Sequence, residues 1–330
     1  MKKWIKRIGI LCLLPIALVL LLSILLYIPP FQDYAISRAT HYAGEATGMQ
    51  ISIKKIRLSF PLNLTVKGVE VVAPTADTLL ALNSLRVSIR PLPLLKKEVL
   101  VDAIDLHGVE VNTGNFISGM EIKGRLGKLY ARADRIDLSD EDATLNTLEL
   151  SDTAITLFLN DTTSEKDTSS TSVNWRFRLN KIALDKVTFG LQMPGDSLRL
   201  ATYIDKALLS DGSVDLGTSL YSVRHFNLSD SQLNYDSGYG VPTEGLDPSH
   251  IALNNLTITA DSLLYQDKKM NARLREFRVE ERSGLAITEL EGTLHSDTTA
   301  INVPGLVLKT AYSEISLQAH VPWSTLNDKP

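Results

Sequence analysis

The alternation of apolar and polar residues at every second position is the feature that most restricts the fold of this 330-residue chain. The alternation starts at Ile51 and Ile53 and recurs through most of the sequence that follows. Successive side chains of a β-strand point to opposite faces, so this period predicts strands with one apolar and one polar face. The chain is therefore expected to fold into a mainly β body over residues 49–330.

The strands follow a repeated unit in which the alternation changes phase once. Its instances are LTVKGVEV, IDLHGVEV, LELSDTAITL, IALDKVTF, FNLSDSQLNY and IALNNLTI, between Leu64 and Ile258. In the second instance Leu106 and Val109 are three positions apart, so an unbroken strand would place them on opposite faces. Either a hairpin loop or a bulge in a continuing strand would keep both on one face. In both cases one face of the sheet stays apolar.

We interpret the phase changes as hairpin loops of an antiparallel sheet. Two-residue loops are expected at Lys67-Gly68, His107-Gly108, Asp185-Lys186 and Asn254-Asn255, and four-residue loops at 151–154 and 229–232. The units are unevenly spaced, with 44 residues from Leu106 to Leu150 and 34 from Leu150 to Leu184. This spacing indicates a loose repeat rather than a strict solenoid.

Two segments interrupt the alternation and are predicted to be surface loops. Residues 160–172, NDTTSEKDTSSTS, contain no apolar side chain, and residues 236–249 are rich in glycine and proline. The first segment is also the candidate position for a domain boundary, at 160–173. Repeated strands on both sides of it favour one extended sheet.

An uncharged apolar segment near the N-terminus predicts a membrane anchor. Residues 8–28 form a run of 21 residues without a charge. A helix of this length, at about 1.5 Å per residue, spans the roughly 30 Å hydrocarbon layer. The apolar core of a cleaved signal peptide has roughly 7–15 residues and ends in a small-residue cleavage site. This segment is longer and ends in Tyr27-Ile28-Pro29-Pro30, so a retained transmembrane helix is the expectation.

Residues 1–7 carry four basic residues and no acidic one. The positive-inside rule therefore predicts a cytoplasmic N-terminal flank and places the body across the membrane. After the anchor, apolar residues from Phe31 to Ala43 recur mostly at three- and four-residue steps, which predicts a short amphipathic helix over 31–47. That helix would rest on the membrane, cap a groove, or pack on the first strands.

Composition argues against several classes of function. The formal net charge is −4, and without the four basic residues of the flank the remainder carries −8, which disfavours nucleic-acid binding. The only cysteine, Cys12, lies in the apolar segment. The six histidines show no metal-ligand spacing, and no glycine-rich phosphate-binding loop occurs. We predict no catalytic residues, cofactor or metal, and hence a protein that is not an enzyme.

The apolar face of the predicted sheet needs a cover. A second sheet would give a sandwich, whereas a curved sheet would form a groove for an apolar ligand, and patterning alone does not choose between them. Each residue could equally serve ordinary core packing. For a lipid groove the candidate lining residues are Leu64, Val66, Val69, Val71, Ile104, Leu106, Val109, Val111, Leu184, Val187, Phe189, Leu253, Leu256 and Ile258.

The first 120 residues or so resemble the AsmA-like proteins, and within them the TamB-type envelope proteins of diderm bacteria. The resemblance consists of the anchor followed in order by FQDYAISRATHYAGEATG, MQISIKKIRLSFPLNLTVKGVEV and LNSLRVSIRPLPLLKKEVLVDAIDLHGVEVNTGNF. Looser repeats continue to the end. TamB-type chains are much longer and have a distinctive C-terminal domain, so the resemblance implies a body that continues beyond residue 330.

The resemblance implies a single-pass protein of the inner (cytoplasmic) membrane with a periplasmic body. The body would be an elongated, curved β-sheet with a hydrophobic groove. The protein would bind membrane and phospholipid and transfer lipid between membranes, in support of cell envelope biogenesis. Some relatives instead assist outer-membrane protein assembly or secretion by binding a partner barrel protein. That scaffold role, without lipid transport, is the alternative expectation.

Overall fold

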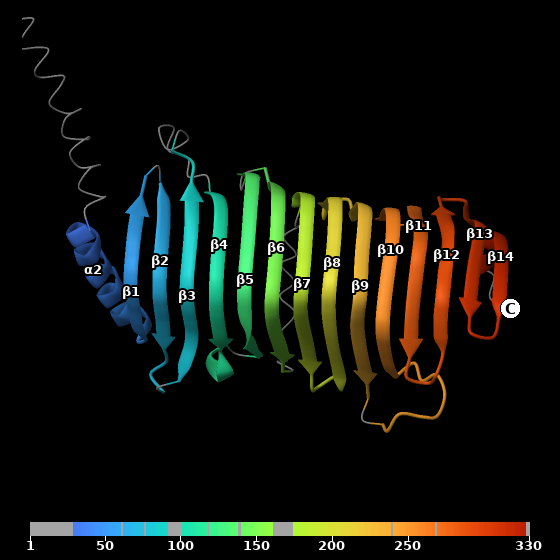
Figure 1. The fold of residues 1–330 in the computed structure, drawn as a ribbon, viewed down its shortest axis with the longest axis horizontal. Coiled ribbons are helices and arrows are strands. Elements are labelled where there is room, and N and C mark those ends of the chain that lie inside the picture. The colour runs from blue at the N-terminus through green and yellow to red at the C-terminus, as the bar shows by residue number, and fades with distance from the viewer. Residues whose placement is uncertain are drawn as a thin grey trace, which may run out of the picture. The chain divides into compact units, whose positions relative to one another are not determined.

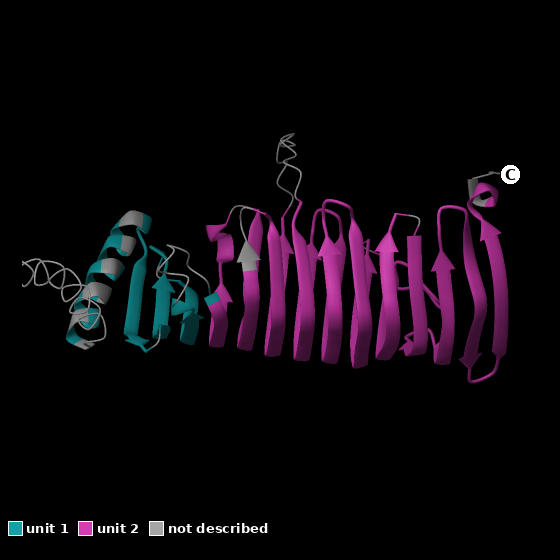
Figure 2. Cartoon of the chain, turned by 90° about the horizontal axis from the view of Figure 1, so that it is seen from above, with its two compact units in different colours: residues 1–101 teal, residues 102–330 magenta. Residues whose placement is uncertain are grey.

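A computed structural model describes residues 29–60, 62–75, 77–91, 101–117, 119–137, 140–160, 174–238, 240–267 and 269–327. The chain forms two compact units, residues 1–101 and 102–330 (Figure 2). The mainly β fold expected from the sequence is confirmed. The basic flank 1–7 and the anchor predicted at 8–28 lie outside the described residues. Within the described ranges, no helix is both long and apolar enough to cross a bilayer.

The described part of the first unit consists of one helix and three antiparallel strands in chain order (Figure 1). These are α2 (Pro29–Thr47), β1 (Gln50–Ser59), β2 (Asn63–Val72) and β3 (Thr78–Ile89). Proline suits the first turn of α2, because that turn leaves its N–H groups without helical partners. The helix ends before Gly48, which has a φ of 70°. The helix predicted over 31–47 is therefore present.

Helix α2 covers the edge of β1 through one side-chain amide. Gln32 Nε2 donates to the carbonyl oxygen of Leu58 at 3.3 Å, and the Leu58 N–H donates back to Gln32 Oε1 at 3.4 Å. Arg57 pairs with Asp33 at 2.6 Å beside this contact. The amide occupies the place of a missing strand neighbour at Leu58 and satisfies both backbone groups of that residue. Of the roles expected for this helix, the structure shows packing on the first strand.

The substitution Gln32→Ala is expected to expose this edge locally. The Leu58 amide would lose its partner, and a net hydrogen bond is worth about 1 kcal/mol. Hydrogen exchange measured by mass spectrometry should therefore accelerate in the peptide containing Leu58. Tyr42→Ala, at an exposed position of the same helix, is the control. Equal exchange in both variants would contradict an edge-covering role.

The second unit contains the strands from β4 onward, each paired with the next in chain order (Figure 1). They are β4 (Val101–Asn112), β5 (Met120–Asp137), β6 (Asp142–Leu159), β7 (Arg176–Met193), β8 (Leu198–Asp215), β9 (Leu220–Ser237), β10 (His250–Gln266), β11 (Lys269–Glu281), β12 (Ala286–Ser296), β13 (Ala300–Thr310) and β14 (Glu314–Pro322). A 3-10 turn, η1 (Gly114–Phe116), follows β4, and α4 (Trp323–Asn327) follows β14.

In each unit the described strands form a single layer, so no second sheet covers either face of the described part. Burial is correspondingly sparse. The described residues include nine buried hydrophobic side chains, and five of these are alanines. Most leucines, isoleucines and valines are only half-buried. A sandwich core is therefore absent from the described part of the chain.

The predicted antiparallel arrangement is wrong for one pair of strands. β6 and β7 are parallel, with Leu150 opposite Leu184 and Ile155 opposite Phe189. Residues 160–175 join the end of β6 to the start of β7, which lies beside the start of β6. A parallel pair needs such a long connection and excludes a tight turn. Apart from Asn160, the loop predicted at 160–172 lies outside the described residues, and the segment falls between neighbouring strands of one unit.

The second predicted loop is present, with β9 continuing to Ser237 before it. Asp247 organises it by accepting hydrogen bonds from the backbone N–H groups of Thr243 at 2.9 Å and Ser249 at 3.0 Å. These bonds lower the pKa of Asp247. The loop between β9 and β10 is thus shaped by its own side chains.

Asp297 shapes the turn between β12 and β13 in the same way. Its Oδ1 accepts hydrogen bonds from the backbone N–H groups of Thr299 at 2.7 Å and Ala300 at 3.0 Å, and from the Thr299 hydroxyl at 2.5 Å. These donors, the hydroxyl first, lower the pKa of Asp297 from 3.8 to about 2. The charged carboxylate is therefore the form that the folded turn favours.

Asp297→Asn is expected to reduce stability at neutral pH but not in strong acid. Because the folded pKa is lowered, the charged form stabilises the fold above pH 3.8, and this contribution disappears as the pH falls toward about 2. Urea unfolding at a series of pH values should show a difference between wild type and variant that shrinks over that window. A difference independent of pH would contradict the assignment.

Candidate functional site

The phase changes of the sequence coincide with single residues of positive φ inside continuous strands. These residues are Gly68, Gly108, Asp152, Lys186, Asp230 and Asn255, with φ between 46° and 61°. The predicted hairpin loops are therefore wrong at all six positions, and a local irregularity in a continuing strand accounts for the shared face. A type I′ hairpin turn needs positive φ at both central residues, and here one residue of each predicted loop has it.

Several pairs of neighbouring strands keep their register through this irregularity, whereas β10 shifts its register against β9 and β11 around Asn255. Asp185 lies opposite Lys206 and Val187 opposite Ile204, on either side of Lys186. The same continuity holds between β4 and β5 on either side of Gly108. Figures 1 and 2 view the second unit at right angles, and its strands run lengthwise in both, which fits strands that bend near their positive-φ residues.

The face that contains Val187 has buried side chains next to this bend. Thr153, Val187 and Ser231, next to the bend in β6, β7 and β9, are only 2%, 7% and 2% exposed. Lys186, by contrast, is exposed. We call the side containing Val187 the inner face of the second unit and the opposite side its outer face.

Cross-strand pairing joins the inner face into continuous rows. The Leu106 row crosses β4 to β11 and consists of Leu106, Leu129, Leu150, Leu184, Ala207, Leu228, Ile258 and Phe277. The Ile104 row crosses β4 to β14 and consists of Ile104, Ala131, Leu148, Ile182, Leu209, Phe226, Ala260, Leu274, Gly292, Leu306 and Leu317. Neither row contains a polar side chain. The inner face is thus an apolar strip that runs across the strands.

The structure assembles the predicted lining residues in two separate sets, one in each unit. In the second unit, pairing and alternation place Ile104, Leu106, Val109, Val111, Leu184, Val187, Phe189, Leu253, Leu256 and Ile258 on the inner face. In the first unit, Leu64, Val66, Val69 and Val71 face Leu58, Ile56, Ile53 and Ile51 of β1 and Val87, Leu85, Leu82 and Leu80 of β3. Both sets consist of apolar side chains.

Sequence reasoning missed the inner-face residues of β5, β6, β8 and β9. The instances LELSDTAITL and FNLSDSQLNY carry the signal for β6 and β9, since Leu150 and Leu228 alternate as the chosen residues do. For β5 and β8, Leu129 and Ala207 are identified by register alone.

The inner face remains partly uncovered by protein. Of the fourteen predicted residues only Val66 and Val187 are buried, and Phe189 is 38% exposed. Further along the unit, the inner face has a hollow of about 390 Å³. Its apolar wall includes Val214, Tyr221 and Tyr265, and the two tyrosine rings lie 6.2 Å apart.

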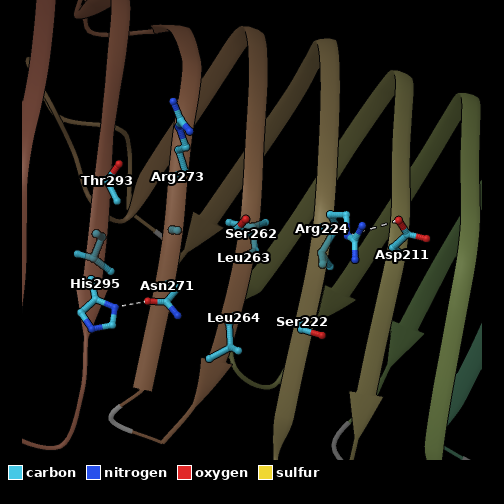
Figure 3. A pocket seen from close by; sticks show the side chains of 13 residues that line it. Asp211, Ser222, Arg224, Ser262, Leu263, Leu264, Asn271, Arg273, Thr293 and His295 are labelled. Carbon is cyan, nitrogen blue, oxygen red and sulfur yellow. Dashed lines mark hydrogen bonds and ion pairs between the residues drawn. The ribbon is translucent and has the colours of Figure 1, made fainter.

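The outer face behind this hollow is more polar. A depression of about 570 Å³ is lined there by Arg224, Asn271, Arg273 and His295 together with apolar side chains such as Leu264 (Figure 3). Arg224 pairs with Asp211 at 3.7 Å, and His295 contacts Asn271. Asp211 has positive φ, so it marks an irregularity in β8. The two faces of the same strands therefore present different chemistry.

Charged side chains of the outer face are satisfied largely by one another. Lys181 contacts Glu149 at 2.8 Å, and this hydrogen bond lowers the pKa of Glu149. His225 lies 2.7 Å from Asp261, which Arg275 also contacts, and both partners lower the pKa of Asp261. Across the described ranges, no three histidine, cysteine, aspartate or glutamate side chains gather in a way that could hold a metal ion.

No family model and no curated protein matches this chain. The inner face is the candidate functional site, because it is a continuous apolar surface that the described strands leave partly exposed. Its side chains offer dispersion and hydrophobic contact to an apolar ligand.

Proposed function

We propose that this protein is anchored in the inner membrane and carries phospholipid along its inner face across the periplasm, without covalent chemistry. The observation that supports this proposal is the unbroken apolar content of the Leu106 and Ile104 rows on a sheet of one layer. The anchor at residues 8–28 and the AsmA-like, TamB-type resemblance are parts of the same proposal. In this proposal the anchor attaches the body to the inner membrane, and the resemblance places the body in the periplasm.

The size of the apolar strip favours a lipid as its cover. Eleven strands spaced about 4.8 Å apart extend the Ile104 row over roughly 50 Å. Soluble monomers rarely expose contiguous apolar patches above a few hundred Å². Covering apolar surface gains about 25 cal/mol per Å², and acyl chains have the flexibility to follow a bent sheet. Because neighbouring positions are chemically alike, a bound chain can move between them without a large barrier.

Site-specific photocrosslinking in membranes tests this function with a matched control. A benzophenone amino acid would replace Leu150, which belongs to the Leu106 row, or Glu149, its neighbour on the outer face. Phospholipid adducts are expected at position 150 and not at 149. Absence of lipid adducts at 150 in a folded protein would overturn the proposal. Protein adducts at 150 in place of lipid would favour the scaffold role in outer-membrane protein assembly.

A further inference from the structure

The two units carry opposite net charge. Residues 1–101 contain 13 basic and 5 acidic residues, a formal charge of +8, whereas residues 102–330 contain 21 and 33, a charge of −12. The two values sum to the −4 of the whole chain. Four of the basic residues belong to the flank 1–7, so residues 29–101 still carry +4. The positive charge of the first unit favours a contact between that unit and an anionic surface.

The hairpin between β1 and β2 presents an aromatic side chain to solvent in this basic unit. β1 ends at Ser59 and β2 begins at Asn63, and between them Phe60 is 86% exposed. Folding of the unit gains little from a phenylalanine in this position. Phenylalanine is, however, among the residues that insert at the boundary between lipid headgroups and acyl chains.

The hairpin tip lies where the chain arrives from the apolar segment. The contacts of Gln32 with Leu58 and of Asp33 with Arg57 place the first turn of α2 beside the end of β1. α2 starts at Pro29, directly after the apolar residues 8–28. An anchor that ends there brings Phe60 to the membrane surface.

Arginines surround the same tip. Arg57, which also pairs with Asp33, lies two residues before Ser59, and Arg86 lies opposite Thr65 in β2. The Ile89 N–H donates to the Leu62 carbonyl at 3.0 Å, which brings Arg90 next to the tip as well. An apolar wedge flanked by guanidinium groups matches a bilayer of anionic phospholipid, whose phosphates accept bidentate hydrogen bonds.

We infer that the β1–β2 hairpin docks on the anionic bilayer surface beside the anchor and inserts Phe60 into it. This inference deepens the proposed function and rests on its anchored topology. The apolar face of the first unit begins at the same end, where Leu58 pairs with Leu64 two residues from Phe60. Lipid leaving the bilayer at the inserted tip meets this pair first.

A depth measurement on the full chain tests the docking. Cys12→Ala removes the only cysteine, and Phe60→Cys then carries an environment-sensitive NBD label. The protein is reconstituted in vesicles of phosphatidylcholine and phosphatidylglycerol that contain doxyl-labelled lipid. The matched control is Tyr312→Cys, at the β13–β14 turn of the acidic unit, where the tyrosine is 97% exposed. Several-fold stronger quenching is expected at position 60 than at 312. Equal quenching at the two positions overturns the inference.

A second measurement in the same vesicles separates this inference from the proposed function. Quenching at position 60 without lipid adducts at Leu150 would retain the docking and overturn the lipid path. Adducts at Leu150 without quenching at position 60 would do the reverse. Omitting phosphatidylglycerol should weaken the quenching at 60, and quenching that does not depend on the anionic lipid would contradict the role of the arginines.

Discussion

Phe189→Asp is expected to slow phospholipid transfer from donor vesicles bearing the protein to acceptor vesicles by about tenfold or more, which corresponds to about 1.4 kcal/mol. Phe189 lies on the inner face between Ile155 and Thr202. A carboxylate there would have to lose water when an acyl chain passes, and burying an unpaired charge costs well above that value. One such barrier interrupts the whole path.

Leu208→Asp is the matched control for this prediction. Leu208 belongs to the neighbouring strand β8, lies opposite Ala183 and Asn227, and faces the outer side. Leu208 and Phe189 are each 38% exposed, so the same change should affect folding similarly at both positions. Transfer by Leu208→Asp should match wild type. Equal slowing in both variants would show that the inner face is not the path.

Gly124→Ala is expected to destabilise the second unit by about 1–3 kcal/mol, as overpacking does elsewhere. Gly124 lies on β5 between Val111 and Ile155. A Cβ at this position would lie 2.8 Å from the Ile155 Cα and would also contact the Ala154 carbonyl oxygen too closely. Both obstacles are backbone atoms, so the strands must separate locally. Thermal unfolding should show a transition lowered by several degrees.

Gly305→Ala provides the contrast on β13, where an added Cβ meets no atom within 4 Å. Alanine restricts the unfolded chain more than glycine does, so this variant should be unchanged or stabilised by about 0.5–1 kcal/mol. Similar losses in the two variants would contradict the close approach of β5 and β6.

The sequence predicted the shared face of Leu106 and Val109 but not the path of the backbone between them. Glycine, asparagine and aspartate favour positive φ in a hairpin turn and in a bent strand alike, so composition at His107-Gly108 does not separate the two. Lys186 adopts positive φ although its residue type gives no indication of it. The tertiary pairing of long strands decides the outcome at these positions.

Strand direction and register were beyond prediction for a related reason. Alternation in β6 and β7 is the same whether the pair is parallel or antiparallel, so Leu150 and Leu184 could not be matched from sequence. The Leu106 and Ile104 rows are defined by which residues pair across neighbouring strands, and the sequence does not specify these pairs. The chemistry of the candidate site was therefore predictable, whereas its continuity was not.

The most direct test of the central claim is mass spectrometry of lipid bound to the full-length protein after purification in mild detergent. The inner face, left half-uncovered by a single layer of strands, predicts co-purifying phospholipid at one or more molecules per chain. Phe189→Asp should reduce that amount, and Leu208→Asp should not. A folded wild-type protein free of lipid, with the same thermal stability before and after phospholipid is added, would contradict the claim.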